Sequence, residues 1–115
     1  MSLQRVLSTL MSFGLKRAEA QVYVFLAKKG PHTGKDLCNA LSMQKPQLYP
    51  CLRNLQNKGL VKATLERPAL FSAVSFEKVL DLLINDKIEE ARHTQRDKDE
   101  ALTNWQSMVK EDSIG

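Results

Sequence analysis

The 115-residue chain contains only two cysteines and lacks any long apolar run. Its longest apolar stretch, VYVFLA from Val22 to Ala27, is far shorter than the roughly 20 residues that a transmembrane helix needs. Cys38 and Cys51 lie within apolar helical patterns, which favours small buried side chains and leaves a redox role without support. With no recognisable signal peptide, the sequence predicts a cytoplasmic protein that does not associate with membranes.

Residues that build metal and catalytic sites are also scarce. The two histidines, His32 and His93, are far apart and have no cysteine or acidic cluster at ligand spacing, so no metal site is expected. The chain has no Ser/His/Asp or Cys/His arrangement, no glycine-rich phosphate loop and no converging carboxylates. We therefore expect no catalytic residues and no cofactor, and predict that the protein is not an enzyme.

Charge is distributed unevenly along the chain. Residues 1–74 contain eleven Lys or Arg and three Asp or Glu, a net charge of +8. Residues 75–115 contain six Lys or Arg and ten Asp or Glu, a net charge of −4. A basic part joined to an acidic part is typical of a polyanion-binding domain with a tail that has another role, although two solvated faces of one domain would give the same imbalance.

Apolar residues at helical spacing predict four helices in the basic part. They are expected at about 3–13, 16–29, 34–41 and 44–58, and the first two end at Gly14 and at Gly30-Pro31. The third helix has a capping pair three residues apart, Thr33 and Asp36.

The apolar period changes to two after the fourth helix. Apolar and polar residues alternate in two short runs, 61–65 and 69–73, with Leu65 on the inward face. Glu66-Arg67-Pro68 between the runs is typical of a turn. We therefore predict a β-hairpin over about 60–74.

Helix, helix, short helix, helix and hairpin is the element order of a winged helix-turn-helix. The predicted fold is mainly α with a small β-hairpin. A winged helix-turn-helix domain is expected over 1–74 and a long C-terminal helix, capped by Ser75, over 75–112. Residues 113–115 are expected to be disordered.

The helix at about 44–58 precedes the hairpin and is therefore the one expected in the DNA major groove. With its leucines inward, its outer face carries Gln, Asn and Arg, which pair with base edges, and Lys, which suits phosphates. The wing, 61–74, is expected to contact the DNA backbone or minor groove. For Tyr49, packing at the rim of the core is an equally good interpretation. The predicted DNA-contacting residues are Thr33, Lys35, Gln44, Lys45, Gln47, Tyr49, Arg53, Asn54, Lys62 and Arg67.

Two prolines lie in this helix, although proline is poorly tolerated inside a helix. Pro46 falls in the first turn, where its missing N–H is not needed. Pro50 lies on the outward face, where water can satisfy the carbonyl that it leaves free. Two interpretations stay open: a helix with a stiffened and bent front end, or a helix that begins near Leu48 after an extended lead-in.

Several of these segments resemble the N-terminal domain of the TrmB-like transcriptional regulators, which are mostly archaeal. The resemblance covers about residues 10–84 and includes the segments FGLKRAEAQVYVFLAKKGPHTGKDLCNAL and LYPCLRNLQNKGLVKATLERPALFSAV. The matching motifs are Gly14-Leu15, Glu19-Ala20 with Tyr23, Tyr49 with Leu52, Leu55 and Lys58-Gly59-Leu60-Val61, and Arg67-Pro68. The resemblance implies operator DNA binding by a dimer that represses or activates transcription.

The chain departs from this family in two ways. The family usually has polar residues where Pro46 and Pro50 stand, so DNA contacts from these positions are not implied. Larger members carry an added effector domain that binds sugars, for which a chain of this length has no room. Sugar sensing is therefore not expected, and any small-molecule effector is unknown.

The long C-terminal helix carries a coiled-coil seam at 4-3-4-3 spacing, interrupted by Gln95 and Lys98. We expect a homodimer, because an exposed apolar stripe of Leu102, Trp105 and Val109 needs cover, and polar seam residues fit a pair of helices in one register. The alternative is that the first half packs on its own winged helix and the part beyond Arg92 frays. Dimerisation would set two recognition helices about 34 Å apart, one turn of DNA. The predicted dimer contacts are Ile84, Ile88, Ala91, Leu102, Trp105 and Val109.

The leading interpretation is a sequence-specific transcriptional regulator that binds double-stranded DNA as a homodimer. The alternative is a winged-helix adaptor that joins proteins in a transcription or other assembly and has no DNA specificity of its own. A polar outward face on the 44–58 helix, within a part of charge +8, favours DNA.

Overall fold

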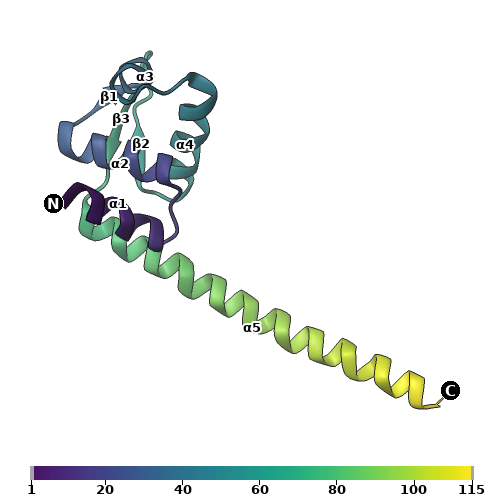
Figure 1. Ribbon diagram of the computed structural model, residues 1–115. Coiled ribbons are helices and arrows are strands. Elements are labelled where there is room, and N and C mark those ends of the chain that lie inside the picture. The colour runs from purple at the N-terminus through teal and green to yellow at the C-terminus, as the bar shows by residue number, and fades with distance from the viewer. Residues whose placement is uncertain (1, 115) are drawn as a thin grey trace. The chain divides into compact units, whose positions relative to one another are not determined.

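The structure, a computed structural model, describes residues 2–114, and side chains as far as residue 112. The order of four helices, hairpin and long helix confirms the predicted winged helix-turn-helix fold (Figure 1). The elements are α1 (Ser2–Ser12), α2 (Arg17–Lys29), β1 (His32–Thr33), α3 (Gly34–Leu41), α4 (Lys45–Asn57), β2 (Val61–Ala63), β3 (Leu70–Ala73) and α5 (Phe76–Ile114).

The chain forms two compact units, residues 1–84 and 85–115. The first unit includes the start of α5, because Val79 and Leu83 are fully buried in its core. The boundary between the two compact units lies between Ile84 and Asn85, within α5. Ser113 and Ile114 are helical rather than irregular, and Gly115 lies outside the described residues.

The sheet has one strand more than the predicted hairpin. β1 and β2 both pair antiparallel with β3, in the order β1-β3-β2, with His32 opposite Phe71 and Val61 opposite Ala73. A strand of two residues is too short to show an alternating pattern, so nothing in the sequence signals β1. The added strand joins the segment that precedes α3 to the wing.

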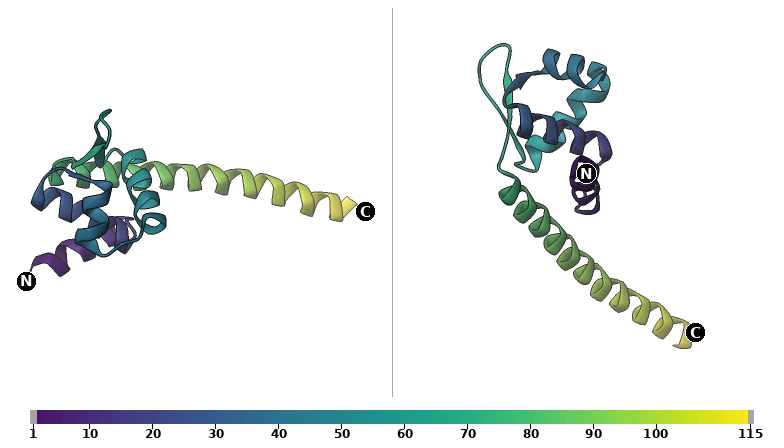
Figure 2. Two further views of the ribbon diagram at one scale, coloured as in Figure 1. Left: turned by 90° about the horizontal axis from the view of Figure 1, so that it is seen from above. Right: turned by 60° about the vertical axis from the view of Figure 1, so that its left-hand side comes forward.

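The hairpin loop projects beyond the helices of this unit, as both views in Figure 2 show. Thr64 closes the loop: its N–H donates to the Leu70 carbonyl at 3.0 Å, and its Oγ1 accepts from the Leu70 N–H at 2.9 Å. Leu65 was expected to face inward but is fully exposed, because β2 ends at Ala63 and Leu65 belongs to the loop.

Both prolines lie within α4, so the interpretation of a helix that begins near Leu48 is wrong. Pro46 lies in the first turn, where the N–H groups of Gln47 and Leu48 donate to the Gln44 carbonyl at 3.0 and 2.9 Å. Pro50 lies inside the helix and is exposed. Because proline has no N–H, the carbonyl four residues earlier, at Pro46, has no helical donor and is left for water or a partner.

α2 is the central helix of the first unit and packs against α1, α4 and β3. Its Ala20 and Tyr23 are fully buried, and so are Leu48 and Leu55 on the inner face of α4. The Tyr23 hydroxyl donates to the Val74 carbonyl at 2.6 Å, which joins α2 to the end of the wing. Burial raises the pKa of Tyr23, so the hydroxyl stays protonated and remains a donor.

A buried carboxylate joins α2 to α4. Glu19 is 3% exposed, and its two oxygens accept from different elements. Oε1 accepts from the N–H of Lys16, the N-cap of α2, at 2.9 Å, and Oε2 accepts from Asn54 Nδ2 on α4 at 3.0 Å. Every buried polar side-chain atom among the described residues has a partner. Glu19 thus caps α2 and also holds α4 against it.

We expect the substitution Glu19→Gln to lower the free energy of unfolding by about 1–3 kcal/mol, because one side-chain oxygen cannot accept from both Lys16 and Asn54. Equilibrium unfolding in urea measures the change. The control is Glu66→Gln, at an exposed position in the hairpin loop, with an expected change within about 0.5 kcal/mol. Equal stability of the two variants would show that the Glu19 contacts contribute nothing.

Candidate nucleic-acid interface

α3 and α4 form the helix-turn-helix, joined by a turn that Ser42 opens in the left-handed conformation (φ 53°). The predicted capping pair of α3 is present: the Asp36 N–H donates to Thr33 Oγ1 at 3.2 Å. Thr33 therefore starts α3 and also pairs with Leu70 in the sheet. These contacts place the N-terminal end of α3 beside the base of the wing.

Two surface hollows meet at a pair of lysines, Lys35 on α3 and Lys45 on α4. The first, of about 570 Å³, lies between the starts of these helices and the base of the wing, and Thr33 and Tyr49 also line it. The second, of about 650 Å³, lies between α3 and the start of α4, and Gln44 lines it. Among the described residues, no acidic side chain lines either hollow. Five of the predicted DNA-contacting residues thus converge on one surface.

Tyr49 packs against Gly34, the first residue of α3. A methyl group added at Gly34 would lie 2.9 Å from the Tyr49 Cζ and in hard contact with its hydroxyl. The ring is nevertheless 39% exposed, and the hydroxyl has no hydrogen-bond partner among the described residues. The structure therefore places the Tyr49 side chain against the start of α3, where it also lines the first hollow. Gly34 is a residue that the sequence did not single out, since helix-starting glycines are common.

The outward face of α4 carries Gln47 and Arg53, which are exposed and make no side-chain hydrogen bond or ion pair with another described residue. Lys62 on β2 and Arg67 in the hairpin loop are also exposed, and their side chains make no hydrogen bond or ion pair with another described residue. Asn54 differs, because its amide is held by Glu19. The structure thus directs one predicted base-reading side chain toward α2.

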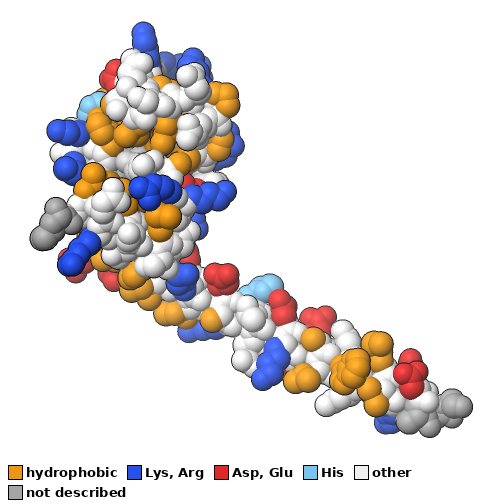
Figure 3. Space-filling model, in the orientation of Figure 1, with side chains coloured by type: hydrophobic (Ala, Val, Ile, Leu, Met, Phe, Trp, Pro, Cys, Tyr) orange, Lys and Arg blue, Asp and Glu red, His pale blue; other side chains and the backbone are white. Residues whose placement is uncertain are grey.

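Basic side chains form several separate patches on the visible face of the first unit, whereas most of the acidic side chains in this view lie along α5 (Figure 3). The exposed apolar residue of the hairpin loop, Leu65, lies next to Glu66 and Arg67. The alternating pattern gives no sign of this exposure, because a strand continued through Leu65 would have placed the side chain inward.

Neither cysteine forms a disulfide. Cys51 is buried on the inner face of α4, where burial raises the pKa of its thiol and the Glu19 carboxylate raises it further, although Lys16 acts in the opposite direction. A raised pKa keeps the thiol protonated and poorly reactive.

A second candidate surface follows the predicted seam of α5. The expected seam residues Ile88, Leu102, Trp105 and Val109 are 44–60% exposed. Met108, which the seam did not include, is also exposed, at 56%. The apolar stripe at the end of this helix therefore has no cover from the described part of the chain. Ile84 is 44% exposed, and Ala91 is also exposed.

Comparison with known proteins identifies the family. The family described as sugar-specific transcriptional regulator TrmB matches residues 10–77. TrmBL1 of Pyrococcus furiosus, named as an HTH-type sugar sensing transcriptional regulator, is 28% identical over 93 residues, which are 81% of this chain and 27% of TrmBL1.

Solved structures with the same fold include TrmBL2, described as an archaeal chromatin protein with a novel mode of DNA binding. It superposes with a TM-score of 0.76 at 28% identity, over 87% of this chain and 40% of TrmBL2. ST1889 from Sulfolobus tokodaii superposes with a TM-score of 0.64 at 21% identity, over 80% of this chain and 99% of that protein.

The chain spans about a quarter of the length of TrmBL1 and two fifths of that of TrmBL2. The family match covers more than half of the chain and includes α2, α3, α4 and the wing. The protein belongs to the TrmB family of transcriptional regulators.

Proposed function

We propose that the protein is a sequence-specific DNA-binding transcriptional regulator that acts as a homodimer, with α4 in the major groove and the wing on the backbone or minor groove. The observation that carries the proposal is the surface around Lys35 and Lys45. There, cationic and amide side chains without partners among the described residues surround two hollows that no acidic residue lines. Such a surface attracts a polyanion and offers donors to it.

The side chains of this surface divide into two groups by chemistry. Lys35 and Lys45 are point charges that suit phosphates, and the Tyr49 hydroxyl beside them is a further donor. Gln47 and Arg53 lie on the outward face of α4 and can form paired hydrogen bonds with adenine or guanine. Gln44 and Thr33 are the N-cap residues of α4 and α3, the helices that carry the two lysines of the first group.

Two predicted residues are placed on the wing, Lys62 and Arg67, and we assign them to the backbone or minor groove. We assign Asn54 to the positioning of α4, since its amide donates to Glu19. A winged-helix adaptor would need an apolar outward face on α4, and the exposed side chains there are mainly polar. A regulator must reach DNA, so the proposal includes the expected cytoplasmic location.

The relatives suggest two modes of DNA binding. TrmBL1 is named as a sugar-sensing regulator, and TrmBL2 is described as a chromatin protein. Base-reading side chains on α4 favour a preference among DNA sequences over binding that is independent of sequence. The experiment below separates these modes.

We expect binding of the protein to random duplex DNA, measured by fluorescence anisotropy, to weaken with salt. If six to eight phosphates are neutralised per dimer, the slope of log affinity against log salt is about −5 to −7. Lys45→Gln should weaken binding to all duplexes alike and make the slope shallower by about two per dimer, one for each copy. Arg53→Ala should instead remove the preference for a selected operator over random DNA, at a cost of about 1–3 kcal/mol.

Lys87→Gln is the matched control, since it removes one exposed cation of α5 that is not part of the helix-turn-helix. Absence of binding at low salt would refute the DNA proposal. A salt-dependent affinity without any sequence preference would refute the specific mode.

For the homodimer, we propose that the apolar stripe of α5 pairs with the same stripe of a second copy. Leu102, Trp105 and Val109 are about half exposed, and contiguous apolar surface of this kind is usually covered by a partner. Gln95 and Lys98 in the same seam would fix the register. The Glu89–Arg92 pair, at 2.7 Å, is exposed and contributes little to either state.

We expect sedimentation equilibrium to give the mass of a dimer at micromolar concentration. Leu102→Asp should raise the dimer dissociation constant at least about tenfold, because two carboxylates would enter an apolar seam. Asn104→Asp makes a similar addition of charge on the opposite side of the helix and should leave the dimer intact. A monomeric wild type, or equal effects of the two substitutions, would contradict this dimer.

A further inference from the structure

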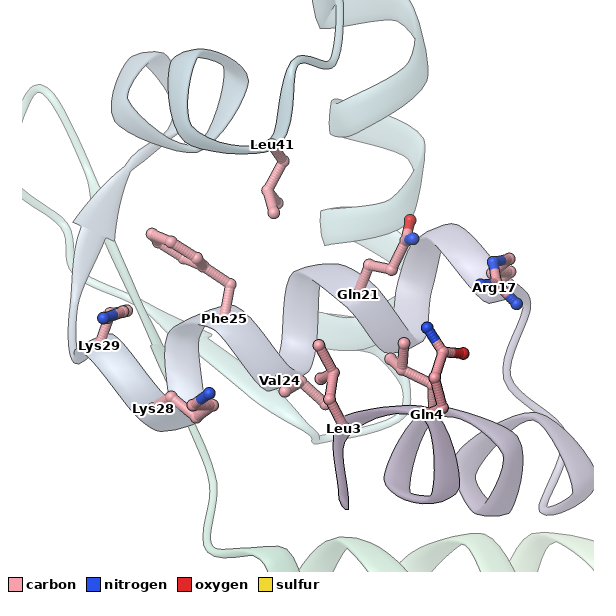
Figure 4. A pocket seen from close by; sticks show the side chains of 10 residues that line it. Leu3, Gln4, Arg17, Gln21, Val24, Phe25, Lys28, Lys29 and Leu41 are labelled. Atoms are coloured by element: carbon pink, nitrogen blue, oxygen red, sulfur yellow. The ribbon is translucent and has the colours of Figure 1, made fainter. Parts of the chain in front are cut away.

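We propose that a pocket between α1, α2 and the C-terminal end of α3 binds a small organic anion with an apolar body (Figure 4). Its volume is about 300 Å³, at the small end of the range for ligand sites in proteins. None of the residues that we assign to DNA lines it. The pocket is thus a separate site within the first unit.

The middle of the pocket is apolar. Leu7 and Val24 are buried and form its floor, and Phe25 and Leu41 are half-buried beside it. Leu3, on the near side, is 50% exposed. An apolar ligand body would remove this leucine from water and gain the corresponding transfer free energy.

Polar side chains stand at the two ends of the pocket. Figure 4 shows Gln4, Arg17 and Gln21 at one end, and Lys28 and Lys29 at the other. None of these five side chains makes a hydrogen bond or ion pair with another described residue, and no acidic residue lines the pocket. Three cations and two amides around an apolar middle are complementary to an anion.

Arg17 is the side chain best suited to hold the charged group. Its planar guanidinium can donate two parallel hydrogen bonds to a carboxylate, and the amides of Gln4 and Gln21 at the same end can add one each. A sugar fits this lining poorly, because its hydroxyls would lie against leucine and phenylalanine with few acceptors to satisfy them. The ligand class is therefore an aryl or short-chain carboxylate.

A ligand here would touch α3 at its C-terminal end and would reach the segment before α3 only through Phe25. Leu41 is the last residue of α3, directly before Ser42 and the turn into α4. Phe25 contacts the His32 ring edge-on, with ring centroids 5.0 Å apart, and His32 lies in β1 just before α3. Movement of α3 would displace Lys35 from Lys45. An effect of the ligand on DNA affinity rests on the proposed function, whereas binding of the ligand to the pocket does not.

The test uses 2-naphthoate as the probe and amide chemical shifts of the isotope-labelled full chain, without DNA. We expect saturable shifts near Leu3, Gln21, Phe25 and Leu41. The neutral analogue 2-naphthalenemethanol should bind about tenfold more weakly, since it loses the charge-assisted hydrogen bonds. Shifts that do not saturate at millimolar probe, or equal affinity for the alcohol, would overturn the proposal.

Matched variants locate the anion. Arg17→Gln should weaken 2-naphthoate binding about tenfold, whereas Arg5→Gln, an exposed arginine of α1 that does not line the pocket, should leave it unchanged. Equal losses in both variants would show attraction to surface charge alone and would also overturn the proposal. DNA affinity with and without 2-naphthoate is a separate measurement, so a failure of the DNA proposal leaves the binding result intact.

Discussion

The packing of α4 against α2 is the constraint on which the rest of the first unit depends. Leu48, Leu52 and Leu55 are almost fully buried against this neighbour, and each contributes roughly 1.5–3 kcal/mol by leaving water. Apolar packing alone allows a helix to slide or rotate slightly. The contact between Glu19 and Asn54 adds a directional bond, because a buried carboxylate without its donor would be costly.

The orientation of the outward face of α4 follows from this packing. With its leucines and Cys51 turned in, α4 turns Gln47 and Arg53 out. The first turn of α4 then meets the start of α3, where Tyr49 packs on Gly34 and brings Lys45 near Lys35. The prolines fit the same arrangement, since both occupy exposed positions where a missing N–H removes no core contact. The proposed DNA surface is therefore a consequence of how the core is packed.

Most of the fold was predictable because its signals are local. Helical periodicity, the glycines that end α1 and α2, and the Thr33–Asp36 cap all lie within a few residues of the feature that they specify. The features that escaped prediction depend on tertiary contacts. β1 exists only through its pairing with β3, and the amide of Asn54, an exposed residue, is held by Glu19, 35 residues earlier, which accepts its hydrogen bond. The pocket beside Arg17 belongs to the same class, since it requires α1, α2 and α3 together.

The most direct test of this account is a titration of the isotope-labelled protein with a short duplex, followed through backbone amide shifts. If α4 is the recognition helix, we expect saturable shifts along the start of α3, the outward face of α4 and the hairpin loop, with the buried amides of α2 changing little. Saturable binding that instead shifts amides of α1 and leaves those around Lys45 and Arg53 unchanged would contradict the assignment of α4 as the recognition helix.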